Sequence, residues 1–347
     1  MRFYTNQHKY YCGIDLHTRK MYICILDEKG EIREHRNLKT DRDAFLKAIA
    51  PFREDIVVAV ECIFTWYWVA DLCHKEGIPF VLGHALYMKA IHGGKAKNDK
   101  IDSQKIAILL RGGMMPMAYA YPAKMRATRD LMRRRNHLMR KRSELYAHIQ
   151  NTNSQYNLPD SFGPISRHQN REGIAGQFEQ PAVQKSIAVD MEMIRTYDGI
   201  LLQLEKSIIK LANNHDPVSY ALLQTIPGVG KIIALIILYE IENIRRFASV
   251  QDFASYSRLV KCAKESNGKK CGSSGSKIGN VHLKWAFSEA AVFFLNGNDP
   301  AKKYLDRLTR KHGKSKALSI LAHKLGRAVY FMLKNKEAFD QKKFLTI

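Results

Sequence analysis

The N-terminal part of the chain has strand and helix patterns in turn. Apolar and polar side chains alternate from Tyr10 to Asp15, and an apolar run follows from Met21 to Leu26, which predicts two strands joined by a short polar turn. Further strands are expected at 31–37, 56–60 and 79–82, and helices at 41–50, 66–76, 84–91 and 99–110, with Asp41 as N-cap of the first helix. This order predicts an α/β layer that ends near Pro122.

A long helical hairpin is expected over residues 123–217. Apolar residues recur every seven positions in two series, Leu131, Leu138 and Leu145 and then Met125, Met132, Met139 and Tyr146, which predicts a long amphipathic helix with a basic outer face. Residues 153–187 contain three prolines and predict a loop. A second helix has the spacing of a coiled-coil seam, at Ile194, Tyr197, Leu201, Leu204, Ile208 and Leu211. This spacing fits an antiparallel hairpin within one chain or a contact between copies.

The remaining region, residues 218–347, is predicted to be mainly helical. Helices are expected at 231–240, 250–258, 282–295, 301–311 and 316–337, and a polar Gly/Ser/Lys-rich stretch at 264–280 is expected to be a loop. The predicted fold class is therefore α/β plus all-α. It comprises three domains: a mixed-sheet α/β domain at 1–122, the helical hairpin at 123–217, and a helical domain at 218–347.

The charge of the chain indicates a nucleic-acid partner. There are 56 Lys and Arg against 33 Asp and Glu, a net charge of +23, and residues 124–142 alone hold nine basic residues and one acid. Basic clusters bind phosphate backbones because the contacts release condensed counterions, although a generally basic enzyme surface is an alternative. No apolar run reaches membrane-spanning length, no signal-peptide pattern is present, and the six cysteines lack zinc-site spacing. We therefore expect a cytoplasmic protein with no membrane partner.

Four carboxylates in the α/β region form a candidate metal site. Asp15 lies at the end of the first strand and Glu61 at the end of a buried strand, and Asp99 and Asp102 are three residues apart on a helix. If these strands are neighbours, the four groups converge at one sheet edge. Oxygen ligands suit Mg²⁺ or Mn²⁺, which can activate a nucleophile at a phosphate. Alternatively, Asp99 is a helix cap and Asp102 a solvated acid.

Two further segments could contact phosphates. The turn Ile226-Pro227-Gly228-Val229-Gly230-Lys231 precedes a helix, as in helix-hairpin-helix motifs, in which Gly228, Gly230 and Lys231 would approach a nucleic-acid backbone. A plain helix-start turn is the alternative. The polar stretch contains serines that could attack phosphorus, namely Ser266, Ser273, Ser274 and Ser276, but taken alone the composition favours a Gly/Ser linker.

These motifs, in this order, resemble the insertion-sequence transposases that have a RuvC-like, RNase-H-like DEDD domain and a C-terminal serine domain, the bridge-RNA-guided recombinases. The resemblance covers nearly the whole chain. It rests on Gly13-Ile14-Asp15, Val60-Glu61, Lys97-Asn98-Asp99-Lys100-Ile101-Asp102, the Pro227-Gly228-Val229-Gly230 turn, Phe253-Ala254-Ser255-Tyr256, Glu265-Ser266 and Ser276-Lys277-Ile278-Gly279.

The resemblance implies roles for these residues. Asp15, Glu61, Asp99 and Asp102 would hold Mg²⁺ or Mn²⁺, and Ser266 would form a covalent link to DNA, with Ser273 and Ser274 as alternatives. Target DNA, donor DNA and an element-encoded guide RNA would be the partners of a dimer or tetramer. The nucleic-acid backbone would be held by Lys124, Arg126, Arg133, Arg134, Arg135, Arg140, Lys141 and Lys277.

Three other functions are compatible with parts of the sequence. A metal-dependent RuvC-like junction nuclease would use water in place of serine and leave cut DNA with free ends. A non-catalytic protein that bridges nucleic acids would not require the carboxylates. An actin-like ATPase would share the Gly-Ile-Asp hairpin, but it needs further glycine-rich phosphate loops, which the N-terminal domain lacks.

Overall fold

The computed structural model describes residues 2–91, 98–158, 163–212, 216–274 and 278–346. It forms two compact units, Met1–Lys124 and Met125–Ile347. The division lies two residues beyond the first predicted domain boundary. The helical hairpin and the C-terminal helices lie together in the second unit.

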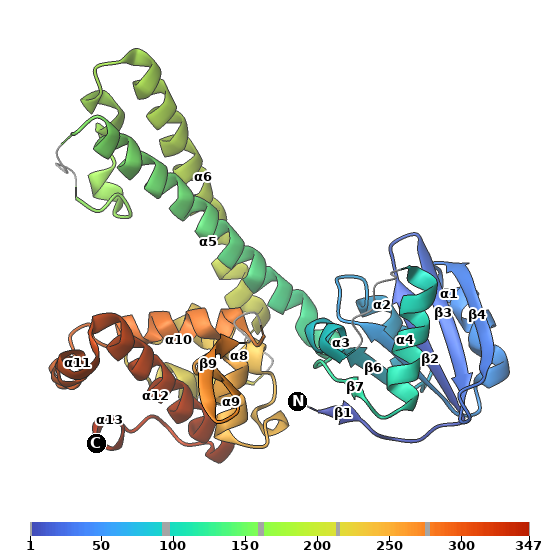
Figure 1. The fold of residues 1–347 in the computed structure, drawn as a ribbon. Helices are drawn as coiled ribbons and strands as arrows, with labels where there is room; N and C mark the ends of the chain where they lie inside the picture. Colours follow the sequence, from blue (N-terminus) through green and yellow to red (C-terminus); the bar gives the residue numbers. More distant parts are fainter. Residues whose placement is uncertain (1, 92–97, 159–162, 213–215, 275–277, 347) are drawn as a thin grey trace. The chain divides into compact units, whose positions relative to one another are not determined.

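The first unit is built on a five-stranded mixed sheet (Figure 1). Its strands are β2 (Tyr10–Leu16), β3 (Lys20–Asp27), β4 (Ile32–Lys39), β5 (Ile56–Glu61) and β6 (Phe80–Gly83), in the order β4-β3-β2-β5-β6. The strands β2, β3 and β4 are antiparallel neighbours, whereas β2, β5 and β6 run parallel. All five strands were predicted, and their order is consistent with an RNase-H-like sheet. A further pair, β1 (Phe3–Tyr4) with β7 (Met115–Pro116), was not predicted.

Helices cover both faces of this sheet. The helices α1 (Arg42–Ile49) and α2 (Tyr67–Lys75) pack on the face that contains Cys12 and Ile14. The helices α3 (Ala85–Ile91) and α4 (Asp99–Arg111) lie on the other face. The predicted helices agree with these bounds within one or two residues. The predicted N-cap of α1, Asp41, is confirmed. Its side chain accepts hydrogen bonds from the amides of Asp43 and Ala44.

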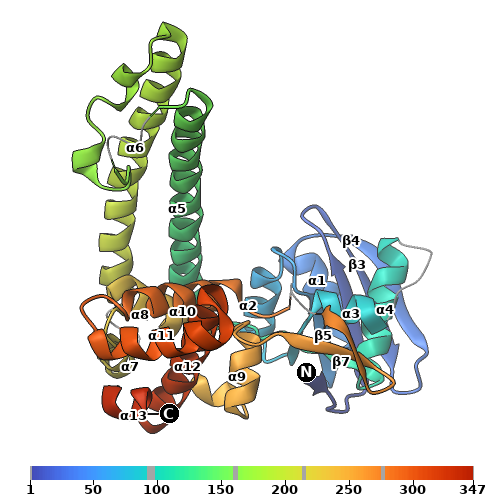
Figure 2. The same cartoon turned by 60° about the vertical axis from the view of Figure 1, so that its left-hand side comes forward.

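The second unit begins with two long helices, α5 (Ala123–Gln155) and α6 (Pro181–Ala212), which run side by side (Figures 1 and 2). Three ion pairs join them: Arg135 with Glu205, Arg142 with Asp198, and His148 with Asp190. The residue numbers in α6 fall as the residue numbers in α5 rise. The two helices are therefore antiparallel, and the hairpin forms within one chain.

Two details of the hairpin differ from the prediction. The predicted loop, 153–187, is shorter, because α6 begins at Pro181; proline is tolerated in the first turn of a helix, where its missing N–H would have no intrahelical partner. The predicted seam is only partly buried. Ile194, Leu201 and Ile208 are buried, but Leu211 is exposed.

The C-terminal helices pack around a large apolar core. They are α7 (Pro217–Gln224), α8 (Lys231–Ile241), α9 (Val250–Tyr256), α10 (Val281–Phe293), α11 (Asp299–His312), α12 (Lys314–Asn335) and α13 (Gln341–Leu345). The most apolar, α8, is buried from Ile233 to Ile241 and lies at the centre of this core. Five of these helices were predicted, whereas the short α7 and α13 were not.

The polar stretch after α9 is a β-hairpin, contrary to the predicted loop. It consists of β8 (Cys262–Ser266) and β9 (Lys269–Ser274). Asn267 and Gly268 form the two-residue turn, with φ of 49° and 70°. Positive φ at both positions matches the twist of a hairpin, and Asn-Gly is the dipeptide that adopts it most readily. This local turn signal outweighs the low apolar content of the flanking residues.

Within the described parts of the chain, we find no helix with the length and apolar character needed to cross a bilayer.

Candidate active site

Asp15 and Glu61 lie side by side at the carboxyl edge of the sheet. The parallel strands β2 and β5 pair with Ile14 opposite Val60, so the next residues of the two strands are neighbours. Side chains alternate between the faces of a strand. Asp15 therefore shares a face with Gly13, and Glu61 shares that same face with Ala59. The sheet register thus brings together two carboxylates that are 46 positions apart in sequence.

Gly13 allows α4 to approach this face closely. A Cβ atom on Gly13 would lie 2.3 Å from the amide nitrogen of Ala107 and 2.4 Å from the carbonyl oxygen of Ser103, both in α4. Figure 1 shows α4 across β2 and β3. The first residue of α4 is Asp99, and Asn98 caps the helix by accepting a hydrogen bond from the Ile101 amide. The Gly-x-Asp spacing of β2 therefore positions the first turn of α4 next to Asp15.

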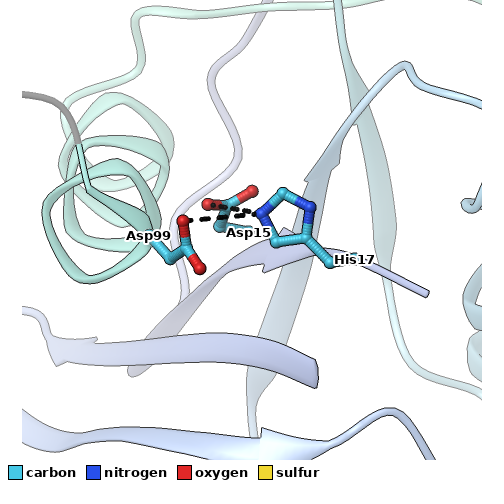
Figure 3. Close-up of side chains that lie close together, drawn as sticks. All are labelled: Asp15, His17 and Asp99. Atoms are coloured by element: carbon cyan, nitrogen blue, oxygen red, sulfur yellow. Dashed lines mark ion pairs between the residues drawn. The ribbon is translucent and has the colours of Figure 1, made fainter. Parts of the chain in front are cut away.

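Asp15, His17 and Asp99 form a compact group that could hold a metal ion (Figure 3). The His17 Nε2 atom lies 3.4 Å from an Asp15 carboxylate oxygen and 3.6 Å from one of Asp99. One ligand atom from each residue lies within 4.8 Å of the others. Asp15 is the most buried of the three, whereas His17 and Asp99 are largely exposed. The group is thus open to solvent on one side.

The electrostatics of the group disfavour an ionised Asp15. Burial raises the pKa of Asp15; His17 opposes that shift, and the nearby charges of Asp99 and Asp102 raise the pKa further. The charged groups named here around Asp15 are thus two further acids, with the His17 imidazole beside them. A divalent cation would supply positive charge beside these acids.

The four predicted carboxylates are not equally close. Asp102 lies in the first turn of α4 and contacts Lys105 at 3.5 Å, and Glu61 is half-buried at the end of β5. Neither belongs to the compact group of Asp15, His17 and Asp99. The acids nonetheless share one sheet face and one helix end, and their hard oxygen donors fit Mg²⁺ or Mn²⁺. That Asp15, Asp99, Glu61 and Asp102 hold such an ion stays a prediction.

His17 was not among the predicted site residues. The strand pattern contains a signal for it, because Gly13, Asp15 and His17 follow at a period of two and continue along one face. In isolation a histidine after a strand is unremarkable. Its position between Asp15 and Asp99 is set by the approach of α4, which the sequence pattern does not show.

Ser266 is the last residue of β8 and is exposed to solvent. It pairs with Lys269 across the Asn267-Gly268 turn. The alternative serines, Ser273 and Ser274, lie in β9. Ser266 therefore stands at the tip of the hairpin, and it belongs to a different unit from the carboxylates. Three residues of the resemblance motifs, Lys97, Ser276 and Lys277, lie outside the described residues.

The base of this hairpin is tied to the helical core. Arg258 Nε donates to the carbonyl oxygens of Ile278 and Gly279, each at 3.0 Å, and so joins the chain before and after the hairpin. Asn280 caps α10 through its side-chain oxygen and donates from Nδ2 to Glu240 at 2.7 Å. The hairpin that carries Ser266 therefore projects from a fixed base.

The basic residues of α5 that were predicted to hold nucleic acid differ in burial, and their binding role stays a prediction. Lys124, Arg134, Arg140 and Lys141 are exposed. Arg126 and Arg135 are buried, and Arg135 is paired with Glu205 at 2.6 Å. Arg133 pairs with the buried Glu240 at 2.8 Å. Buried cations need such partners, so Arg135 joins α5 to α6, whereas the partly exposed Arg133 joins α5 to α8.

The two glycines of the predicted phosphate-binding turn have different environments. Gly228 has a φ of +81°, and a Cβ there would lie 2.4 Å from the carbonyl carbon of Phe293. Close packing against the end of α10 is thus sufficient to explain this glycine. Gly230 is the N-cap of α8, with open space around its Cβ position, and Lys231 beside it is exposed. Phosphate binding at Gly228, Gly230 and Lys231 stays a prediction.

Comparison with known proteins identifies relatives over both units. A family model described as "Transposase", of the IS110 DEDD type, matches residues 12–157, and one described as "Transposase IS116/IS110/IS902 family" matches residues 220–306. The transposase for insertion sequence element IS1111A of Coxiella burnetii is 24% identical over 343 residues, which cover 94% of this chain and 90% of that protein. A probable family 20 transposase of Pseudomonas aeruginosa is 22% identical over 347 residues, covering 94% and 97% of the two chains.

A carboxylate cluster on a mixed sheet, together with these matches, defines the class of the protein as a DNA transposase, an enzyme that recombines DNA. Within this class, the two matched regions are similar to IS110-type transposases and to the IS116/IS110/IS902 family of insertion-sequence transposases. The first matched region includes the four predicted carboxylates and the second includes Ser266. The predicted family is thereby confirmed at the level of insertion-sequence transposases.

Proposed function

We propose that this transposase cuts and exchanges DNA strands through a covalent link between Ser266 and DNA, at a site where Asp15, Glu61, Asp99 and Asp102 hold Mg²⁺ or Mn²⁺. The observation that carries the metal site is the convergence of Asp15 and Asp99, which comes with a raised Asp15 pKa caused first by burial. The exposure of Ser266 at the hairpin tip supports its role, because a nucleophile must reach a phosphate.

The proposed reaction conserves phosphodiester energy. The Ser266 Oγ atom attacks phosphorus and loses its proton, and the bond from phosphorus to a DNA oxygen breaks, so that this oxygen takes up a proton and leaves as a DNA hydroxyl. In the second step, a DNA hydroxyl loses its proton and attacks the phosphorus of the serine–DNA link, and the serine oxygen leaves and takes up a proton. A bound divalent cation would stabilise the negative charge on the phosphate. Because Ser266 and the carboxylates belong to different units, a complete site requires the units, or two copies of the chain, to meet.

We further propose that an element-encoded RNA guides the reaction and that a dimer, or a tetramer when two DNAs are joined, carries it out. The net charge of +23 and the exposed Lys124, Arg134, Arg140 and Lys141 support more than one nucleic-acid partner. Transcripts of the DNA that flanks the gene provide the test. A structured transcript should bind tightly and be required for strand exchange, whereas exchange without any RNA would contradict the proposal.

The covalent step is tested by trapping the protein on DNA. We expect the wild-type protein, with target DNA, donor DNA, guide RNA and Mg²⁺, to give a protein–DNA adduct that resists SDS. Ser266→Ala should lose this adduct and keep its folding and DNA binding, and Ser273→Ala should retain it. An adduct in Ser266→Ala would show that another residue is the nucleophile. Cut DNA with free ends and no adduct would favour a nuclease that uses water.

A further inference from the structure

An open cavity of about 580 Å³ adjoins the carboxylate group. His17 lines this cavity and also contacts Asp15 and Asp99, so the two sites share a wall. The remaining lining includes three aromatic side chains, Phe64, Tyr67 and Trp68, with Arg42 and Thr40. The volume lies in the range of small-molecule binding sites. An aromatic cavity next to candidate metal ligands calls for a ligand that has both an aromatic and a phosphate-bearing part.

Phe64 is the most unusual residue of this cavity. Its side chain is 82% exposed, the largest value among the exposed large hydrophobic residues of the described chain. It lies in the segment between Glu61, which ends β5, and α2. An aromatic ring held in water forgoes the free energy of burial, and its face stays accessible to a ligand.

The segment that carries Phe64 is anchored by the two residues that follow it. Thr65 Oγ1 donates to the Leu16 carbonyl oxygen at 3.1 Å, which ties the segment to the end of β2. The next residue, Trp66, is buried and packs edge-on against Tyr67 with ring centroids 4.7 Å apart. The backbone that carries the Phe64 ring is therefore held in place. It follows the end of β5, the strand that neighbours the strand of Asp15. A preorganised ring loses little entropy when a ligand stacks on it.

We propose that this cavity receives an unpaired base of the DNA strand whose phosphate lies at the carboxylates, with the base stacked on Phe64. Every base has an aromatic face, and stacking on protein aromatic residues tolerates any sequence. Arg42 and Thr40 provide polar atoms at the edge of the cavity. The Asp41 carboxylate is already engaged in capping α1. The inference deepens the proposed function, since it assumes that DNA is cut at this carboxylate site.

A base held in the cavity would be unstacked from its neighbours. Enzymes that need access to an atom inside a duplex displace a nucleotide in this way, at a cost that is smallest where the strand is already unpaired. The cavity would thereby fix which phosphodiester lies at Asp15 and Asp99 and would favour separated strands over intact duplex. The recognised chemistry is thus a flat base attached to a phosphate that lies beside the metal site.

The test is a fluorescence binding assay with the full-length protein. The probe is a DNA duplex with a short single-stranded gap in which 2-aminopurine stands between two abasic positions, so that it has no neighbouring base to stack on, and Ca²⁺ replaces Mg²⁺ so that the DNA stays intact. Stacking quenches 2-aminopurine. We expect quenching with the wild type and Phe64→Tyr, and loss of quenching with about 10-fold weaker binding in Phe64→Ala, equivalent to about 1.4 kcal/mol. Phe331→Ala, at another exposed ring, is the matched control.

The outcomes separate this inference from the proposed function. Equal quenching by Phe64→Ala and Phe331→Ala would show that no base enters the cavity, as would undiminished binding of a gap whose bases have been removed. Quenching of an RNA probe with none of a DNA probe would also overturn the proposal. Adduct formation in Ser266→Ala would refute the proposed nucleophile but would leave the quenching result unaffected.

Discussion

At the scale of single residues, Asp15 shows an opposition between stability and function. Burial and the neighbouring acids raise its pKa, so the folded protein disfavours the ionised form that the site would use to bind a cation. An acid whose pKa is raised on folding destabilises the fold when it is charged. Acids with a raised pKa are typical of active sites, because a destabilising residue is kept only where function requires it.

We therefore predict that Asp15→Asn raises the melting temperature of the protein in the absence of divalent cations. The same change should abolish DNA cleavage and reduce the rise in melting temperature that Mg²⁺ or Mn²⁺ causes, since a ligand that binds only the folded state stabilises it. Thermal unfolding with and without the cation measures both effects. Asp306→Asn, at an exposed acid of α11, is the control. An undiminished response of Asp15→Asn to the cation would contradict a metal site there.

Gly13 gives a second prediction at this scale. A methyl group at Gly13 would collide with two backbone atoms of α4, so Gly13→Ala should displace the helix, destabilise the first unit by about 1–3 kcal/mol and lower the cleavage rate. Denaturant unfolding and a cleavage assay provide the measurements. Gly199→Ala is a matched change in α6 with open space around it, and it should stabilise by up to about 1 kcal/mol. Similar effects at the two glycines would contradict the close packing.

At the scale of elements, one buried acid connects three helices of the second unit. Glu240 of α8 accepts hydrogen bonds from Arg129 Nε at 3.0 Å and Arg133 Nε at 2.8 Å, both from α5, and from Asn280, which caps α10. Burial alone would raise the pKa of Glu240, but the two arginines and Asn280 outweigh it and lower the pKa to about 2. The long hairpin is thereby fixed to the base of the hairpin that carries Ser266.

The pKa of Glu240 predicts a pH-dependent contribution to stability. Because its pKa falls from 4.5 to about 2 on folding, the ion cluster contributes about 3 kcal/mol above pH 4.5, and the contribution is lost as the pH falls toward 2. Glu240→Gln should be less stable than the wild type at neutral pH, and the difference should shrink on acidification. Urea unfolding at several pH values measures it. A difference that is independent of pH would indicate a packing defect and no role for the charge.

At the scale of the whole molecule, the net charge of +23 divides into cations that support the fold and cations that face solvent. Arg126 and Arg135 are buried, whereas Arg134 and Arg140 on the same helix are exposed. Only exposed cations can release counterions from a nucleic acid. Arginines that pack between helices therefore do not add to the binding surface, although they are counted in a basic run of the sequence.

This division predicts opposite behaviour of two double variants. Arg134→Gln with Arg140→Gln should weaken nucleic-acid binding and reduce the salt dependence of log K by about 2, roughly 0.9 for each phosphate contact, with stability retained. Arg126→Gln with Arg135→Gln should lower the melting temperature instead. Titrations at several salt concentrations and thermal melts distinguish the two. An unchanged salt dependence in the exposed pair would place the nucleic acid elsewhere.

The sequence by itself determined the features that depend on local pattern. Strand alternation, helical periodicity and caps such as Asp41 located every strand of the central sheet and most of the helices, because these patterns reflect burial along a single element. The acids were placed by the same patterns, because Asp15 and Glu61 fall at the ends of predicted strands and Asp99 and Asp102 are three residues apart on a predicted helix. The hairpin at Ser266 was missed although the Asn267-Gly268 turn is a local signal, because the flanking residues lack the apolar alternation of a strand.

Only the tertiary structure decided which residues meet. The register of β2 beside β5 and the close approach of α4 over Gly13 brought Asp15, His17 and Asp99 together, and they left Phe64 exposed beside them. The burial of Arg126 and Arg135 likewise depends on the partner helix. Contacts between distant segments depend on how whole elements pack. The pattern of residues along one element does not specify which other element packs against it.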